Sequence, residues 1–168
     1  MHPLTEPDIR ASFINCTKGE ARRLPVPKPL EAIPWPDLDY LGWIDQGSPE
    51  HAYLVASWND RMVGITLRVP PKGTKSMIRT STCALCLTAH SSTGVTLFTA
   101  RKAGAAGRQG NTRGTYICSD LACSLYLRGK RRPEIVQPTE TLSTDDKILR
   151  VRINLDKFLD GLFARAPA

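Results

Sequence analysis

Two cysteine pairs decide the fold of this 168-residue chain, Cys83-Ala84-Leu85-Cys86 and Cys118-Ser119-Asp120-Leu121-Ala122-Cys123. Four thiolates with this spacing can surround one zinc ion tetrahedrally, and a site with no open position on the metal is structural rather than catalytic. The first pair lies in a short turn, where two intervening residues allow both sulfurs to face one point. The pattern therefore predicts one structural Zn²⁺ held by Cys83, Cys86, Cys118 and Cys123.

The sequence around the second pair predicts how this site is built. Residues 114–117 have strand character, Ser119 and Asp120 are typical N-cap residues, and residues 121–128 suit a short helix before Gly129. Cys118 would then leave a strand, and Cys123 would lie in the first turn of the helix. A knuckle, a hairpin and a helix with ligands in its first turn form a treble clef, which we place at about residues 80–133.

Two disulfide bonds between the same four cysteines are the alternative, and a secreted protein would favour them. However, the first six residues lack the basic and apolar regions of a signal peptide. Cys16 also makes the number of cysteines odd, at five. Paired cysteines in a reducing compartment usually bind metal, so we expect zinc and a cytoplasmic location.

The composition is that of a globular protein, with 41% hydrophobic and 23% charged residues. No apolar run approaches the roughly 20 residues that span a bilayer, so we expect no membrane contact. The formal net charge of +7 favours acidic partners such as RNA, the ribosome or an acidic protein surface, without choosing among them.

The sequence predicts two parts of the chain, a short N-terminal helical segment at residues 1–24 and an α+β domain at residues 25–168. Thr5 can cap a helix in which Ile9 and Phe13 share a face, and Lys18-Gly19-Glu20 is expected to end it. Residues 25–36 contain five prolines, which predict an ordered extended connection. Large apolar residues follow, so this connection is expected to pack on a core.

Strand patterns come next. Residues 51–58 and 61–69 are rich in β-branched and aromatic residues and flank Asn59-Asp60, which predicts a hairpin. Residues 95–100 predict a further strand. From Ser143 and Thr144 to Arg165, apolar residues recur every three or four positions, which indicates an amphipathic helix docked on the sheet. The predicted fold class is α+β: an antiparallel sheet, a four-cysteine treble clef and a C-terminal amphipathic helix.

Two basic stretches are candidates for partner contacts. Residues 101–113 contain four basic residues among glycines, so we expect a flexible loop. This loop could order on a phosphate backbone or on an acidic protein surface, or it could be a solvated hairpin tip. The second stretch, Arg128 to Arg132, lies at the end of the predicted treble-clef helix, and we favour partner contact over simple solvation there.

The sequence shows no sign of an active site, so we expect a non-enzyme without a small-molecule substrate. A zinc hydrolase needs an open position for water, which four cysteines do not leave. His90 could replace one cysteine as a ligand, or it could be an ordinary residue beside the site. Cys16 has no identifiable base near it, and a buried apolar thiol is the commoner role.

The chain also resembles a known family through three further stretches: ASFINCTKGEARRL at residues 11–24, WPDLDYLGW at 35–43 and AYLV at 52–55. With the four cysteines, these are similar to the elongation factor G-binding (FBP, FusB-type) proteins, specifically their C-terminal treble-clef zinc-finger domain. The resemblance covers nearly the whole chain. It implies a bacterial cytoplasmic protein that binds elongation factor G and promotes its release from the ribosome.

In resistant members of that family, this release rescues translation from fusidic acid. Full-length resistance proteins carry an N-terminal helical bundle before this domain. Only one short helix precedes the shared region here, so we expect that bundle to be largely missing.

The resemblance also implies a contact surface made by an aromatic residue beside the finger and by basic and aromatic residues on or after its helix. The matching positions are Phe98, Tyr126, Arg128, Lys130, Arg131 and Arg132. Phe98 and Tyr126 could instead belong to the core. The alternative function is an RNA- or ribosome-binding zinc module without affinity for elongation factor G, which the positive charge supports equally well.

Overall fold

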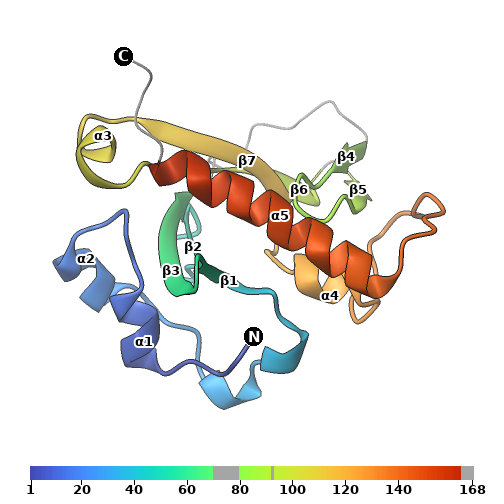
Figure 1. Cartoon of the computed structure of the whole chain (residues 1–168), viewed down its shortest axis with the longest axis horizontal. Helices are drawn as coiled ribbons and strands as arrows, with labels where there is room; N and C mark the ends of the chain where they lie inside the picture. The colour runs from blue at the N-terminus through green and yellow to red at the C-terminus, as the bar shows by residue number, and fades with distance from the viewer. Residues whose placement is uncertain (70–79, 92, 164–168) are drawn as a thin grey trace.

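The computed structural model describes residues 1–69, 80–91 and 93–163. A five-stranded antiparallel sheet forms its centre, and a two-stranded sheet stands beside it (Figure 1). In spatial order, the large sheet consists of β1 (Tyr40–Ile44), β2 (His51–Trp58), β3 (Arg61–Arg68), β6 (Val95–Arg101) and β7 (Thr112–Cys118). The small sheet consists of β4 (Thr80–Thr82) and β5 (Ala89–Ser91). The predicted α+β class with an antiparallel sheet is confirmed.

The hairpin of β2 and β3 forms as predicted. Asn59 and Asp60 have φ angles of 48° and 58°, the left-handed values that a two-residue turn of type I′ requires at both central positions. Asn and Asp tolerate this conformation better than most residues do. The turn sets the register Trp58 opposite Arg61, which places Leu54 and Ile65 side by side on one face.

One face of the sheet is covered by the long helix α5 (Thr144–Phe163) (Figure 1). Its first turn is capped by Ser143, whose Oγ accepts a hydrogen bond from the Asp146 N–H at 3.1 Å. The buried side of the helix is the predicted apolar stripe, formed by Val151, Leu155, Phe158, Leu159 and Leu162. The amphipathic helix is confirmed up to Phe163, whereas its expected end at Arg165 lies outside the described residues. Within the described residues, no helix is both long and apolar enough to cross a membrane.

The opposite face of the sheet is covered by the N-terminal segment. It holds two helices, α1 (Glu6–Ala11) and α2 (Lys18–Arg23), where the sequence predicted one helix that ended at residues 18–20. The physical reason is a second capping box: the Glu20 N–H donates to Thr17 Oγ1, and the Thr17 N–H donates to Glu20 Oε2. Residues 18–20 therefore begin a helix instead of ending one.

The proline-rich connection contains two short 3₁₀ helices, Leu30–Ala32 and Trp35–Asp37, and packs under the sheet as expected. Trp35 is buried in a second apolar cluster, together with Ile9, Leu41 and Val55. Strand β1 directly follows this connection and was not predicted. The N-terminal segment and the sheet thus share one core, while the boundary at residue 24 stays a prediction.

Asn15 separates β3 from β6. These strands share a single register pair, Arg68 with Thr99. Beyond that pair, the Asn15 side chain accepts the Thr66 N–H at 2.8 Å and donates to the carbonyls of Thr66 and Arg101 at 3.0 and 3.1 Å. The Asn15 side-chain amide therefore replaces part of the backbone hydrogen bonding between β3 and β6, and the two strands diverge around it.

The basic stretch at residues 101–113 is an ordered connection between β6 and β7, contrary to our expectation of a flexible loop. It contains a short helix, α3 (Gly104–Arg108). The Ala103 N–H donates to the Leu162 carbonyl at 2.9 Å, so the connection satisfies one of the carbonyls that end α5.

Candidate metal centre

The two predicted cysteine pairs meet at one point. The Sγ atoms of Cys83, Cys86, Cys118 and Cys123 all lie within 4.8 Å of one another, and all four residues are buried. The Sγ atoms of Cys83 and Cys123 are 3.5 Å apart, and those of Cys86 and Cys118 are also 3.5 Å apart. A tetrahedral zinc site with Zn–S distances of about 2.3 Å has sulfurs about 3.8 Å apart. This four-cysteine centre therefore has the size that such an ion requires.

The first pair sits in the turn between β4 and β5. The Leu87 N–H donates to the Cys83 carbonyl at 3.0 Å, which closes the turn, and the Leu85 N–H donates to Cys83 Sγ at 3.4 Å. The Ala84 N–H donates to the Tyr116 carbonyl at 2.8 Å, which ties this knuckle to β7. The turn thus fixes both sulfurs relative to the large sheet.

The second pair joins a strand to a helix, as predicted. Cys118 is the last residue of β7, and Cys123 is the first residue of α4 (Cys123–Leu127). The helix begins two residues later than expected, because Leu121 has a left-handed φ of 57° that no helix accommodates. Leu121 is buried against β1, where a Cβ on Gly42 would lie 2.7 Å from the Leu121 Cβ. Gly42 allows β1 to approach this knuckle.

All four cysteines are free in the structure, and Cys83 Sγ–Cys123 Sγ and Cys86 Sγ–Cys118 Sγ are each 3.5 Å apart, well beyond the roughly 2.05 Å of a disulfide bond. Their electrostatics call for a cation. Burial raises the pKa of the Cys123 thiol, whereas hydrogen bonds from Cys118 and Cys123 lower the pKa of Cys86. Four buried thiolates without a compensating positive charge would repel one another strongly. The donor set therefore fits a soft or borderline divalent metal ion.

His90 is not a fifth member of the centre, but it supports a cysteine. It is buried, and its Nε2 lies 3.3 Å from Cys118 Sγ. Its ring packs edge-on against Tyr126, with centroids 4.8 Å apart. Of the two roles that the sequence left open for His90, the structure favours a neighbour that donates a hydrogen bond to a ligand.

Tyr40 is a second neighbour that sequence reasoning missed. Its side chain is 1% exposed, and its hydroxyl has no hydrogen-bond partner among the described residues. Burial raises its pKa, and the sulfur of Cys123 adds to this effect. Because a thiolate is a better acceptor than a thiol, an ionised Cys123 is the group that this orphaned hydroxyl suits.

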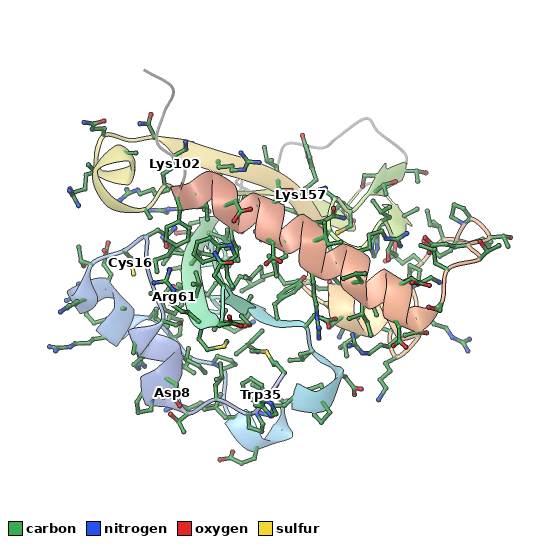
Figure 2. The ribbon with its side chains drawn as sticks, viewed as in Figure 1. Asp8, Cys16, Trp35, Arg61, Lys102 and Lys157 are labelled. Atoms are coloured by element: carbon green, nitrogen blue, oxygen red, sulfur yellow. The ribbon has the colours of Figure 1, made fainter. Side chains whose placement is uncertain are left out.

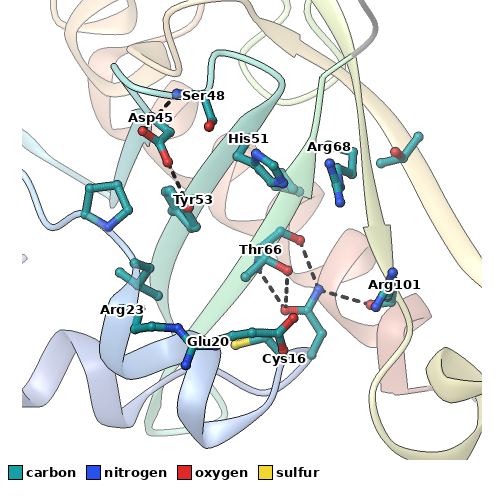
Figure 3. Close-up of a pocket in the computed structure, with 15 residues that line it drawn as sticks. Cys16, Glu20, Arg23, Asp45, Ser48, His51, Tyr53, Thr66, Arg68 and Arg101 are labelled. Atoms are coloured by element: carbon teal, nitrogen blue, oxygen red, sulfur yellow. Dashed lines mark hydrogen bonds between the residues drawn. The ribbon is translucent and has the colours of Figure 1, made fainter.

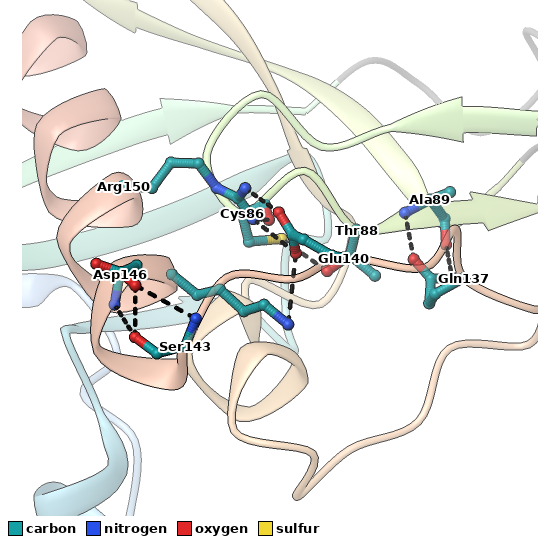
Figure 4. Close-up of polar contacts among 9 residues, drawn as sticks. Cys86, Thr88, Ala89, Gln137, Glu140, Ser143, Asp146 and Arg150 are labelled. Atoms are coloured by element: carbon teal, nitrogen blue, oxygen red, sulfur yellow. Dashed lines mark hydrogen bonds and ion pairs between the residues drawn. The ribbon is translucent and has the colours of Figure 1, made fainter.

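Helix α5 and the segment before it hold the first knuckle from outside (Figure 4). Arg150 donates to the Cys86 carbonyl at 3.1 Å and Asn154 donates to the Leu85 carbonyl at 3.0 Å. Arg150 is itself paired with Glu140. Gln137 bonds both the N–H and the carbonyl of Ala89, at 2.9 and 2.8 Å, and so acts as a strand neighbour for β5.

The predicted partner contacts do not all reach the surface. Phe98 has no exposed area and belongs to the main core beneath α5, so it is removed from the contact set. Arg128 is also mostly enclosed: its side chain is 14% exposed and forms a double hydrogen bond with Asp39, at 2.6 and 3.1 Å. Arg128 thus links α4 to the start of β1.

The other four predicted contacts lie together on the outside of α4 and the turn after it. Lys130 pairs with Asp37 at 2.7 Å, and Arg131 pairs with Asp120 at 2.7 Å. The Tyr126 hydroxyl donates to the same Asp120 carboxylate at 2.8 Å. We call this surface the α4 patch, formed by Tyr126, Lys130, Arg131 and Arg132.

Cys16 lies away from the four-cysteine centre, on the N-terminal segment that covers the other face of the sheet (Figure 2). It is partly buried, and this burial raises its pKa. A raised pKa keeps the thiol protonated, which fits the packing role expected from the sequence.

Comparisons with known proteins identify the family of this chain. No curated protein matches the chain. A solved structure of the fusidic acid resistance protein FusC is similar, with 19% sequence identity and a TM-score of 0.47 over 83% of this chain and 50% of that one. This chain therefore spans about half the length of that protein. The family described as FBP C-terminal treble-clef zinc-finger matches residues 8–162, nearly the whole sequence. This match covers both cysteine pairs and every strand described above, so the chain belongs to the FBP C-terminal treble-clef zinc-finger family.

Proposed function

We propose that the four-cysteine centre binds one structural Zn²⁺. The spacing of the four sulfurs, their burial and the family's zinc-finger description support this assignment. When bound, the ion neutralises the thiolates and cross-links the β4–β5 turn to β7 and α4. The protein's own part is to present four sulfurs at one point and to exclude water from them.

His90 provides a test of how the centre holds its metal. Replacing His90 by Phe keeps an aromatic ring against Tyr126 but removes the hydrogen-bond donor to Cys118. Loss of such a supporting hydrogen bond is expected to weaken zinc affinity about tenfold or more. The measurement is competition with a chromogenic chelator, with His51→Phe as the control because His51 lies on β2 outside the centre. Equal zinc affinities for wild type and His90→Phe would show that His90 does not support the ligand.

We further propose that the protein binds elongation factor G and promotes its release from the ribosome, without catalysing a reaction. Family membership over residues 8–162 carries this proposal. Such a protein would act in the bacterial cytoplasm, and in cells exposed to fusidic acid the release would give tolerance. The mechanism would be tighter binding to the released conformation of the factor than to its ribosome-bound conformation.

The α4 patch is the contact surface that we propose. Its first residue, Tyr126, lies in the same short helix as Cys123, and its three cations lie in the turn that follows this helix. Its exposed cations suit an acidic protein face, and the metal would hold them in a fixed orientation.

Calorimetric titration with elongation factor G tests this surface. The triple variant Lys130→Gln, Arg131→Gln, Arg132→Gln is expected to weaken one-to-one binding about tenfold, because charges at an interface rim steer association. The matched control replaces three exposed arginines elsewhere, Arg22, Arg61 and Arg108, by Gln. Equal affinities for the two triple variants would contradict the assignment of the patch.

The same titration separates this proposal from the RNA-binding alternative. Binding of the protein factor with modest salt dependence supports our proposal. No heat with the factor, together with tight RNA binding that falls steeply with salt, would place the protein in the nucleic-acid class instead.

A further inference from the structure

A cavity of about 300 Å³ lies where β3 and β6 diverge around Asn15, on the sheet face opposite α5 (Figure 3). It shares no residue with the four-cysteine centre or the α4 patch. Its walls come from α2, from the turn after β1 and from β2, β3 and β6. The volume is at the lower end of the range for small-molecule sites.

Three arginines from three different elements line this cavity. Arg23 ends α2, Arg68 ends β3 and Arg101 ends β6. Over residues 1–69, 80–91 and 93–163, none of these three guanidinium groups makes a hydrogen bond or an ion pair. Other arginines among the described residues, such as Arg22 and Arg108, also lack an ion pair, so the distinguishing feature of these three is that they line one cavity.

The sheet register brings two of these charges together. Thr99 is opposite Arg68, and Arg101 lies two residues beyond Thr99 on the same face of β6. Diagonal neighbours on one face of a sheet are about 7–8 Å apart, within reach of long side chains. Like charges at this spacing repel each other, so an anion between them would be favoured.

The cavity's two carboxylates accept hydrogen bonds from groups other than the arginines. Asp45 accepts hydrogen bonds from the N–H groups of Gly47 and Ser48, at 2.8 and 3.2 Å, and from the Tyr53 hydroxyl at 3.3 Å. Burial raises the pKa of Tyr53 to about 12, so this hydroxyl stays protonated as a donor. Glu20 accepts the Thr17 N–H at 2.7 Å as part of the capping box of α2. Among the described residues neither carboxylate forms an ion pair with the arginines, although the Thr17 hydrogen bonds lower the pKa of Glu20 and the charges of Arg101 and Arg23 add to this effect.

We propose that this cavity binds the phosphate group of a small phosphorylated molecule. Guanidinium groups match phosphate oxygens with paired hydrogen bonds, and arginines on three elements can surround one tetrahedral anion. The Thr99 hydroxyl, which also lines the cavity, adds a neutral donor. The bound phosphate would bridge α2, β3 and β6 across the gap that Asn15 opens in the ladder.

Calorimetric titration with inorganic pyrophosphate, at constant ionic strength, tests the proposal on the intact protein. Arg68→Gln and Arg101→Gln are each expected to weaken binding about tenfold or more, since each removes a charge-assisted hydrogen bond. Arg108→Gln is the matched control, because Arg108 is an exposed arginine outside the cavity. Saturable binding that only the cavity variants weaken supports the site. Absence of saturable binding, or an equal loss in Arg108→Gln, would overturn it.

Two further arms identify the anion and exclude a purely structural role. Succinate at equal concentration is expected to bind more weakly than pyrophosphate, and equal affinities would overturn the assignment to phosphate. The melting temperatures of Arg68→Gln and Arg101→Gln without ligand are expected to equal or exceed that of wild type, because repulsion is relieved. A clear fall in melting temperature would show that the arginines stabilise the fold instead. None of these results depends on binding of elongation factor G.

Discussion

Replacing Cys118 by Ser is expected to abolish stoichiometric zinc binding and to lower the melting temperature by at least roughly 10 °C. The first reason is the size of the metal's contribution, about 10–16 kcal/mol in isolated zinc-finger peptides. For a chain of this length, each kcal/mol lost lowers the melting temperature by about 2–4 °C. The second reason is position: Cys118 is fully buried and lies within 3.5 Å of both Cys86 Sγ and His90 Nε2.

Cys16→Ser is the matched control for this experiment, because Cys16 is a free cysteine outside the centre. It should retain one zinc per chain and melt close to wild type. Zinc content by atomic absorption and melting by calorimetry are the two measurements. A Cys118→Ser protein with full zinc content and an unchanged melting temperature would show that Cys118 is not a ligand.

Replacing Arg128 by Met is expected to destabilise the protein by about 3–5 kcal/mol, because it leaves a buried carboxylate without its main partner. The Asp39 side chain has no exposed area, and Arg128 supplies both of the short hydrogen bonds to it. The value should fall toward the lower end of this range, since Arg152 Nη2 lies 3.5 Å from the same carboxylate.

Lys130→Met is the control for Arg128→Met. Lys130 also pairs with an aspartate of the same N-terminal region, but its side chain is 55% exposed, and exposed pairs contribute at most about 1 kcal/mol. Denaturant unfolding measures both variants. The double variant Asp39→Asn, Arg128→Met should recover part of the loss, because no buried charge remains unpaired. Equal effects of Arg128→Met and Lys130→Met would contradict a structural role for the Arg128–Asp39 pair.

The Arg128–Asp39 pair also shows a limit of prediction from the sequence. Arg128 looked like part of a basic surface because it stands beside Lys130, Arg131 and Arg132 in the chain. Its acidic partner is 89 residues away, and nothing in the local pattern connects the two. For Phe98 the sequence left both a contact role and a core position open, because strand alternation predicts two faces but does not say which one a helix will cover; the structure places it in the core.

The elements that the sequence did predict are those whose causes are local. Asn59-Asp60 determines a two-residue turn, the cysteine spacing determines the knuckles, and the apolar period of α5 determines its buried side. The second N-terminal helix has an equally local signal, the capping box of Thr17 and Glu20. The arginine-lined cavity has no local signal, because Asn15 contacts residues 51 and 86 positions away.

The central claim is that the zinc-bearing protein releases elongation factor G from ribosomes. The most direct measurement is sedimentation of ribosomes that carry the factor locked by fusidic acid, with and without the zinc-loaded protein. Our account predicts that the protein moves the factor from the ribosomal pellet to the supernatant, and that Cys118→Ser does not. An unchanged amount of factor in the pellet, at protein concentrations that saturate binding in calorimetry, would contradict it.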